Sequence, residues 1–310
     1  MPPFGYDSRM RVLVTGAAGF IGGWAINELA RLGYDVIGTD KVPKPGLIQA
    51  DITNFVQIKK VIHQTKPDAI VHLAAISGST GKNEIEQSLR QAKMNFEVNS
   101  QGTINICEAC RLLNVRKLIY MSSFAVYGRT DSDRLPITPD TPVSLKHAYA
   151  NSKYMGELAV KTYSEDFGLK SAIFRAPFVA GEHQNERNVL LEFILSAQKG
   201  EDLVIFGQGN HVREFLHPVD LVSAFDKALA FLDGSASACE TFVVGNTPIT
   251  INDLAQLVVL KVKRGHVRHL TRTVDRAFNQ HSDFAKATKM LKWKPVIQVG
   301  EIVERILKSD

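Results

Sequence analysis

The sequence predicts an α/β protein with a doubly wound parallel sheet and a smaller C-terminal region. Apolar, β-branched runs alternate with segments of helical periodicity as far as Pro177, and the first run ends in a glycine-rich loop that opens a helix. After Pro177 this alternation gives way to polar loops and isolated elements. Strands that are apolar on both faces and separated by helices are typical of a parallel sheet covered on both sides.

The elements expected in the first part follow in order. Gly33 is the expected end signal of the first helix. The expected strands are 11–16, 35–40, 68–75, 117–123 and 170–177, and the expected helices are 21–34, 54–67, 95–115 and 147–169.

The second part carries fewer strand signals. A polar loop at 181–188 and a glycine turn at 206–210 separate its elements. The expected helices are 189–200, 217–232, 250–263 and one within 282–295, and the expected strand is 240–246. We therefore expect a sheet domain over 1–175, to which 213–247 returns, and a smaller region made of 176–212 and 248–310.

Composition is that of an ordinary globular protein, with 45% hydrophobic and 22% charged residues, a net charge of +5 and a pI near 9.0. No apolar run approaches the roughly 20 residues of a membrane helix. The first nine residues are too short and polar for a secretory signal and are expected to be a loose tail. The densest basic stretch, Lys261 to His269, has no interleaved aromatic residues. We expect neither a membrane nor a nucleic-acid partner.

The chain has three cysteines, Cys107, Cys110 and Cys239. A small and odd number argues against a disulfide framework and indicates a reducing compartment, and hence the cytoplasm. Cys107 and Cys110 form a CxxC inside an apolar helical pattern and lack a second ligand pair at zinc spacing. We interpret them as small buried helix residues and expect no metal site.

The loop "VTGAAGFIG" predicts a dinucleotide site of the Rossmann type. Gly16 permits the tight turn, Gly19 lets the backbone approach a pyrophosphate, and Gly22 lets the helix pack on the strand. The helix N-terminus offers unpaired N–H groups to the phosphates. Asp40, which ends the second strand, suits the two ribose hydroxyls of NAD and repels the 2′-phosphate of NADP, although Lys41 weakens that preference.

Tyr149 and Lys153 are four residues apart and so share one helix face. A tyrosine pKa near 10 is too high for a base at neutral pH, but a neighbouring ammonium and a positive nicotinamide ring both favour the phenolate. With a serine hydroxyl from "SSFAVYG" (122–128), the set suits removal of an alcohol proton while a hydride leaves. The alternative is a surface tyrosine and a solvated lysine.

Further motifs stand in a fixed order: "TGAAGFIG", "HLAA" (72–75), Asn99 before "GT", "SSFAVYG", "YANSK", "REFLHPVDL" and "DFAKATKMLKWKP". On these motifs the sequence resembles an extended short-chain dehydrogenase/reductase of the NAD-dependent sugar epimerase/dehydratase family, from Arg11 almost to the C-terminus, and most closely the UDP-glucose 4-epimerase-like members. The resemblance implies that Ser123, Tyr149 and Lys153 are catalytic, with Tyr149 as the base, and that Ser123 and Tyr149 also contact the substrate. It implies cofactor contacts from Gly16, Gly19, Phe20, Ile21, Gly22, Asp40, Lys41, Asp51, Ile52, Leu73, Ala74, Ala75, Asn99, Ser122, Tyr149 and Lys153.

The resemblance also implies that Arg213 holds the diphosphate of a nucleotide sugar, a role that a guanidinium fork suits. The alternative for Arg213 is a structural ion pair with Glu214 or Asp220. Where family epimerases have an asparagine that meets the nucleotide sugar, this chain has Phe178, which the resemblance therefore places among the substrate-binding residues.

A second phosphate contact is expected from Arg272 or, as we assign it, Arg276. His147, two residues before Tyr149, is a candidate for the sugar pocket, the alternative being a surface histidine.

Within the family, the residues after the catalytic serine separate the reactions. Dehydratases carry an Asp-Glu pair there and decarboxylases a glutamate, whereas this chain has Phe124 and Ala125, which move no proton. We therefore expect a UDP-hexose 4-epimerase with tightly held NAD. The alternatives are an NAD-dependent dehydrogenase or ketoreductase with net redox change, and a non-catalytic dinucleotide-binding protein.

The helices around 99–113 and 149–167 carry apolar residues on more than one face. In the resembled family the matching helices pair two subunits, so we expect a homodimer.

Overall fold

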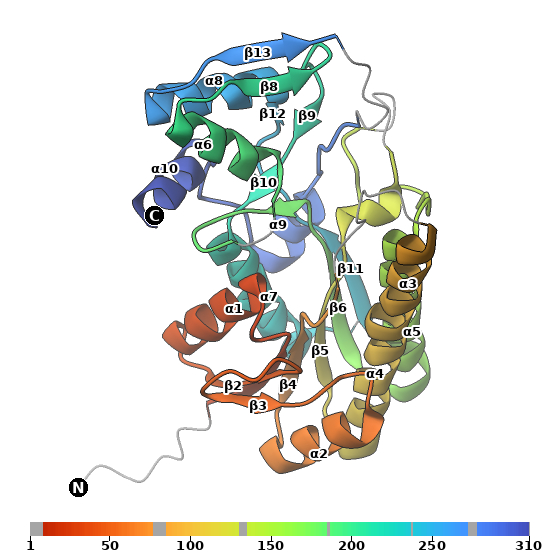
Figure 1. Ribbon diagram of the computed structural model, residues 1–310. Helices are drawn as coiled ribbons and strands as arrows, with labels where there is room; N and C mark the ends of the chain where they lie inside the picture. The colour runs from red at the N-terminus through yellow and green to blue at the C-terminus, as the bar shows by residue number, and fades with distance from the viewer. Residues whose placement is uncertain are drawn as a thin grey trace, which may run out of the picture. The chain divides into compact units, whose positions relative to one another are not determined.

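The computed structural model describes residues 9–76, 85–129, 135–184, 187–236, 238–271 and 278–309 (Figure 1). Of the expected loose tail, residues 1–8 lie outside these ranges. The chain forms two compact units. The first is made of Met1–Ser122, His147–Ile173 and Phe225–Glu240, and the second of Ser123–Lys146, Phe174–Ala224 and Thr241–Asp310.

A seven-stranded sheet runs through the first unit in the order β11-β6-β5-β4-β1-β2-β3. The strands are β1 Arg11–Thr15, β2 Asp35–Asp40, β3 Leu47–Gln49, β4 Ala69–His72, β5 Lys117–Met121, β6 Lys170–Arg175 and β11 Cys239–Val243. β1 pairs in parallel with both β2 and β4, so that Val14 lies opposite Gly38 on one side and Val71 on the other. The strand order reverses at β1, and in such sheets ligands bind beyond the carboxyl ends of the strands at this reversal. The expected Rossmann-like α/β fold is confirmed.

Helices cover the sheet because its central strands are apolar on both faces; every residue of β4 is buried. Figure 1 shows α2, α4 and α5 side by side as one layer, with α1 on the other side of the sheet. The helices are α1 Phe20–Arg31, α2 Phe55–Thr65, α3 Ile85–Asn95, α4 Gly102–Leu113, α5 Ala148–Phe167 and α7 Pro218–Gly234, with a π-helical turn at Phe96–Gln101. Cys107 and Cys110 are fully buried in α4, as expected.

The second unit packs helices around short strand pairs. Its apolar core joins residues of α6, α8 and α10, among them Leu190, Leu254 and Ile302. The helices are α6 Val189–Lys199, α8 Ile251–Val262, α9 Ala285–Leu291 and α10 Val299–Ser309. The strand pairs are β7 Phe178–Val179 with β10 Phe215–Leu216, β9 Val212–Arg213 with β12 Ile249–Thr250, and β8 Leu203–Phe206 with β13 Val267–Leu270.

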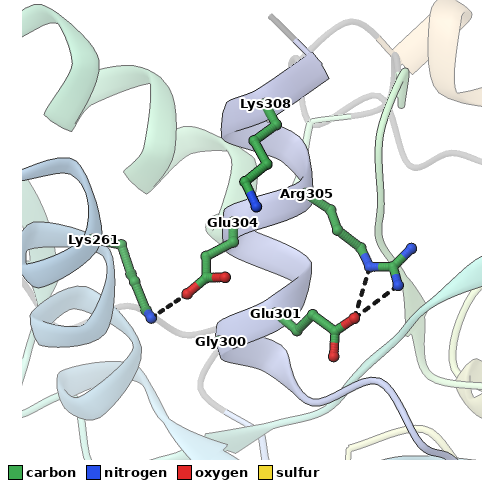
Figure 2. Close-up of a pocket in the computed structure, with 6 residues that line it drawn as sticks. All are labelled: Lys261, Gly300, Glu301, Glu304, Arg305 and Lys308. Carbon is green, nitrogen blue, oxygen red and sulfur yellow. Dashed lines mark hydrogen bonds and ion pairs between the residues drawn. The ribbon is translucent and has the colours of Figure 1, made fainter.

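The outer face of α10 lines an open groove with α8. Figure 2 shows the charged side chains of α8 and α10 that line this groove, with contacts between oppositely charged groups. Lys261 of α8 pairs with Glu304, and the Arg305 guanidinium donates to Glu301 at 2.7 Å. The groove is therefore a solvent-exposed surface on which oppositely charged side chains form ion pairs.

Within the described ranges, each helix is too short or too polar to cross a bilayer.

Candidate cofactor and active site

The glycine loop after β1 is shaped by close backbone contacts. Gly16 has a φ of +72°, and a Cβ atom there would lie 2.6 Å from the backbone nitrogen of Ala74. A Cβ atom on Gly22 would overlap the carbonyl oxygen of Gly16. Both positions therefore require glycine, and the loop after β1 lies directly against the loop after β4.

The N-terminus of α1 is open to an anion. Its N-cap is Gly19, which brings no capping side chain, and the first turn contains no acidic residue. The backbone N–H groups at Phe20 and Ile21 and the positive end of the helix dipole therefore point out of the glycine loop. This arrangement, together with Gly16 and Gly22, fits the pyrophosphate of a dinucleotide.

Asp40 is held at the same loop. One carboxylate oxygen accepts a hydrogen bond from the N–H of Ala18 at 3.0 Å, and the other accepts from the N–H of Val42 at 2.9 Å. Lys41 is exposed. The carboxylate is thus fixed at the end of β2, the position from which ribose hydroxyls are bound in Rossmann folds.

Asp51 and Ile52 form a turn beyond β3. The Asp51 carboxylate accepts from the N–H and the hydroxyl of Thr53, at 2.9 and 2.8 Å. The carbonyl of Ile52 accepts from the side-chain amide of Asn105 at 2.8 Å, and a Cβ atom on Gly102 would lie 2.5 Å from Ile52 Cδ1. The start of α4 therefore fixes this turn.

A buried chain of hydrogen bonds connects the loops after β1 and β4 to the start of α4. The Thr103 hydroxyl donates to the carbonyl of Asn99 at 2.6 Å, so its oxygen accepts from His72 Nε2, 3.1 Å away. His72 Nδ1 then accepts from the Thr15 hydroxyl at 2.7 Å, and Thr15 Oγ1 accepts from the N–H of Ala74 at 3.2 Å. Burial, and then the charge of Lys153, lower the pKa of His72 to about 3, so the ring is neutral. Sequence analysis quoted His72 in a motif but gave it no role.

Asn99 connects the loop after β4 to α5. Its side chain accepts from the N–H of Ile76 at 2.9 Å and donates to the carbonyl of Ile76 at 3.1 Å and to the Ser152 hydroxyl at 3.0 Å. The residue lies in the π-helical turn Phe96–Gln101, a geometry frequent at functional sites. The backbone around Leu73 and Ala75 is thereby held from two sides, since Leu73 also donates to the carbonyl of Thr15 at 3.2 Å.

Tyr149 and Lys153 follow the N-terminus of α5, where the His147 ring accepts from the N–H of Ala150 at 3.3 Å. His147 is exposed and its ring stacks on that of Tyr149, with centroids 6.4 Å apart. His147 is thus the helix cap as well as a neighbour of Tyr149. The proposed base is half-buried, whereas Lys153 is buried.

Lys153 lies in a desolvated position against β5. Its ammonium nitrogen is 4.5 Å from the centre of the Tyr120 ring, and the Tyr120 hydroxyl donates to the Lys153 carbonyl at 3.0 Å. Burial lowers the pKa of Lys153 to about 7, while the charge of Glu157 acts in the opposite direction. A solvated surface lysine is therefore ruled out.

The two serines of "SSFAVYG" have different partners. Ser122, in the first unit, donates its hydroxyl to the buried carboxylate of Glu157 at 2.5 Å. Ser123, in the second unit, accepts from the N–H of Ala125 at 3.1 Å and begins a 3₁₀ turn, Phe124–Tyr127. Sequence analysis missed Glu157, although it continues the four-residue spacing of Tyr149 and Lys153.

Arg213, in β9 of the second unit, is only 7% exposed. Its guanidinium donates to the carbonyls of Val212 and Phe278 and lies over the Phe278 ring. Burial lowers the pKa of Arg213 to about 10.

The acids considered as structural partners of Arg213 are engaged elsewhere. Glu214 accepts from the N–H and hydroxyl of Ser282, and Asp220 accepts from the N–H groups of Val296 and Ile297. Among the described residues, no carboxylate forms an ion pair with this guanidinium.

Phe178, the other expected substrate residue of the second unit, pairs with Phe215 across β7 and β10, and the two rings stack with centroids 6.1 Å apart. It also packs on the apolar core of this unit. Arg272 and Arg276 lie outside the described residues.

Known proteins resemble this chain in sequence and in fold. Residues 12–245 match the family described as "NAD dependent epimerase/dehydratase family". The UDP-glucose 4-epimerase of Lactobacillus helveticus is 29% identical over 314 residues, 92% of each chain. The UDP-glucuronate 4-epimerase of Thermodesulfobacterium geofontis is 29% identical over 318 residues, 94% of each chain. The crystal structure of the Thermus thermophilus UDP-glucose 4-epimerase with NAD superimposes with a TM-score of 0.81 at 24% identity, covering 97% of this chain and 98% of that one.

Proposed function

Because the chain belongs to the NAD-dependent epimerase/dehydratase family and uses NAD, we propose that it is a UDP-hexose 4-epimerase. In this proposal the first unit carries the cofactor and the base Tyr149, and the second unit supplies further substrate contacts. The observation that carries the nucleotide-sugar assignment is Arg213, a buried guanidinium without a carboxylate partner among the described residues. A buried cation of this kind is stabilised by an anionic ligand, and a diphosphate matches its fork of donors.

NAD, when bound, would supply the chemistry of accepting a hydride from the sugar C4 and giving it back. Tyr149 removes the proton from the C4 hydroxyl. Lys153 favours the phenolate of Tyr149 by its positive charge, and Ser123 holds the reacting oxygen by a hydrogen bond. Asp40 binds the ribose hydroxyls, and the open end of α1 binds the pyrophosphate.

The residues after Ser123 favour epimerisation over elimination of water. Phe124 is buried and Ala125 has no ionisable group, so neither transfers a proton. The second candidate is a dehydrogenase or ketoreductase, favoured by Phe178, which offers an aromatic ring where family epimerases offer an amide.

The test is incubation with a panel of UDP-, dTDP- and GDP-sugars, with products separated by chromatography and nicotinamide absorbance followed in parallel. We expect interconversion of two C4 epimers of a UDP-sugar without net change in NADH. Stoichiometric NADH formation on adding substrate contradicts the proposal and supports the dehydrogenase. Tyr149→Phe is the inactive control.

A further inference from the structure

Glu157 is a buried carboxylate one helical turn beyond Lys153. It is fully shielded from solvent, and the hydroxyl of Ser122 at the end of β5 donates to it at 2.5 Å. At this point α5 lies tightly on β5, since a Cβ atom on Gly156 would overlap the Tyr120 hydroxyl. The tight packing fixes Glu157 relative to the sheet. A hydroxyl donor favours the charged form of a carboxylate.

Of the titratable groups around Lys153, Glu157 is the one that acts as its counter-charge, as a comparison of its neighbours shows. From β4, His72 is neutral, because burial and Lys153 itself lower its pKa to about 3. From β5, burial raises the pKa of Tyr120 well above its usual value, so this residue is uncharged at neutral pH. On α5 itself, Tyr149 lies one turn before Lys153. Among these described neighbours, Glu157 is the group whose charge raises the pKa of Lys153.

We propose that Glu157 is a positioning residue for catalysis: its carboxylate, fixed by the Ser122 hydroxyl, keeps the buried Lys153 side chain in the charged ammonium form that Tyr149 needs. The catalytic part of this inference rests on the proposed function, whereas the effect on Lys153 belongs to the folded protein alone.

The energetic reason is the opposition of two effects on Lys153. Burial lowers the pKa of Lys153 to about 7, and the charge of Glu157 is what holds it that high. Without the carboxylate, Lys153 would lose its proton below neutral pH. The positive charge beside Tyr149 would then be absent, and the phenol would keep its proton.

The experiment compares Glu157→Gln, Ser122→Ala and wild type, with the exposed Glu165→Gln on the same helix as the control. The Lys153 amine is labelled competitively with trace acetic anhydride from pH 5 to alkaline pH, and the label is read by mass spectrometry. Only the free amine reacts, so this measures the pKa of Lys153 without substrate. At pH 5, where almost all of the wild-type amine is protonated, we expect labelling in Glu157→Gln to be about tenfold higher if that pKa falls by one unit, with the midpoint of the labelling curve moved to lower pH. Labelling of Lys153 should rise less in Ser122→Ala than in Glu157→Gln, and labelling in Glu165→Gln should match wild type.

Turnover is measured over the same pH range. We expect kcat of Glu157→Gln to fall about tenfold or more at neutral pH, with its alkaline limb moved to lower pH and NAD affinity unchanged. An unmoved labelling curve in Glu157→Gln overturns the inference even where epimerisation is confirmed. If that variant does not fold, an unmoved curve in Ser122→Ala overturns it. A shifted curve with no turnover on any sugar leaves the positioning role standing and removes the proposed substrate.

Discussion

The carboxylate of Asp40 accepts a hydrogen bond at 3.0 Å from the backbone N–H of Ala18, 22 residues earlier in the chain. The contact joins the end of β2 to the glycine loop after β1. It places a negative charge beside the loop that we expect to bind the dinucleotide.

From this contact we predict a preference for NAD over NADP. A 2′-phosphate would meet the fixed carboxylate as a like charge, so NADP binding to the cofactor-free protein should be weaker by about tenfold or more, or at least 1.4 kcal/mol. Calorimetric titration of both cofactors measures this. Equal binding of NADP would mean that Lys41 outweighs Asp40.

Tyr149→Phe should nearly abolish turnover while NAD remains bound. The variant keeps the ring that stacks on His147 but loses the hydroxyl that we propose takes the substrate proton. Loss of a general base costs about 100- to 10,000-fold in rate. The control is Tyr154→Phe on the same helix, which should keep wild-type activity. Retention of more than half the activity in Tyr149→Phe would remove Tyr149 from the mechanism.

Arg213→Ala should weaken UDP binding by roughly 1.5–3 kcal/mol, the range for hydrogen bonds to charged groups. NAD affinity should be unchanged, because we place the dinucleotide phosphates at the N-terminus of α1. Arg213→Lys should recover part of the loss, since an ammonium lacks the guanidinium fork. Arg268→Ala, an exposed arginine of the same unit, is the control. Unchanged UDP binding in Arg213→Ala would mark Arg213 as structural and move the substrate away from nucleotide sugars.

Glu214→Gln should stabilise the protein at alkaline pH. Burial raises the pKa of Glu214 to about 7, against 4.5 when exposed, so its stabilising effect is complete below pH 4.5 and is lost as pH rises through 7. An amide has no such titration and can still accept from the Ser282 N–H. Thermal unfolding at pH 8 should favour Glu214→Gln by about 1–3 kcal/mol, and the advantage should shrink toward pH 5. A difference that does not change with pH would contradict this assignment.

We predict a homodimer in which α4 and α5 of two subunits pack together. Leu112 on α4 and Met155, Leu158 and Phe167 on α5 are 42–54% exposed, which leaves an apolar surface on these helices. An isologous contact would cover it in both subunits. Light scattering should give a dimer mass for wild type and for Leu260→Glu on α8, and a monomer mass for Leu158→Glu. A monomeric wild type at micromolar concentration would refute the prediction.

The sequence by itself determined the parts of this protein that depend on local pattern. The apolar strand runs, the helix of Tyr149 and Lys153, and the glycine positions all follow from rules that act over a few residues. Gly16 illustrates this, since its φ of +72° is a local requirement that only glycine meets easily. The helix at 299–309 could also have been predicted, because its apolar residues Ile302, Val303 and Ile306 form one buried face. Sequence analysis did not predict it.

Tertiary structure decided which strands pair and which side chains form hydrogen bonds with each other. The two-residue strands β7, β9, β10 and β12 exist only because another strand lies beside them, so they leave no periodic signal. The Ser122–Glu157 bond joins residues 35 apart and the Thr15–His72 bond residues 57 apart. Such pairings depend on how the sheet and helices meet. Burial then changes the chemistry of individual side chains. The sequence shows that residue 153 is a lysine, but the lowering of its pKa to about 7 comes from its desolvated position against Tyr120, which only the tertiary structure reveals.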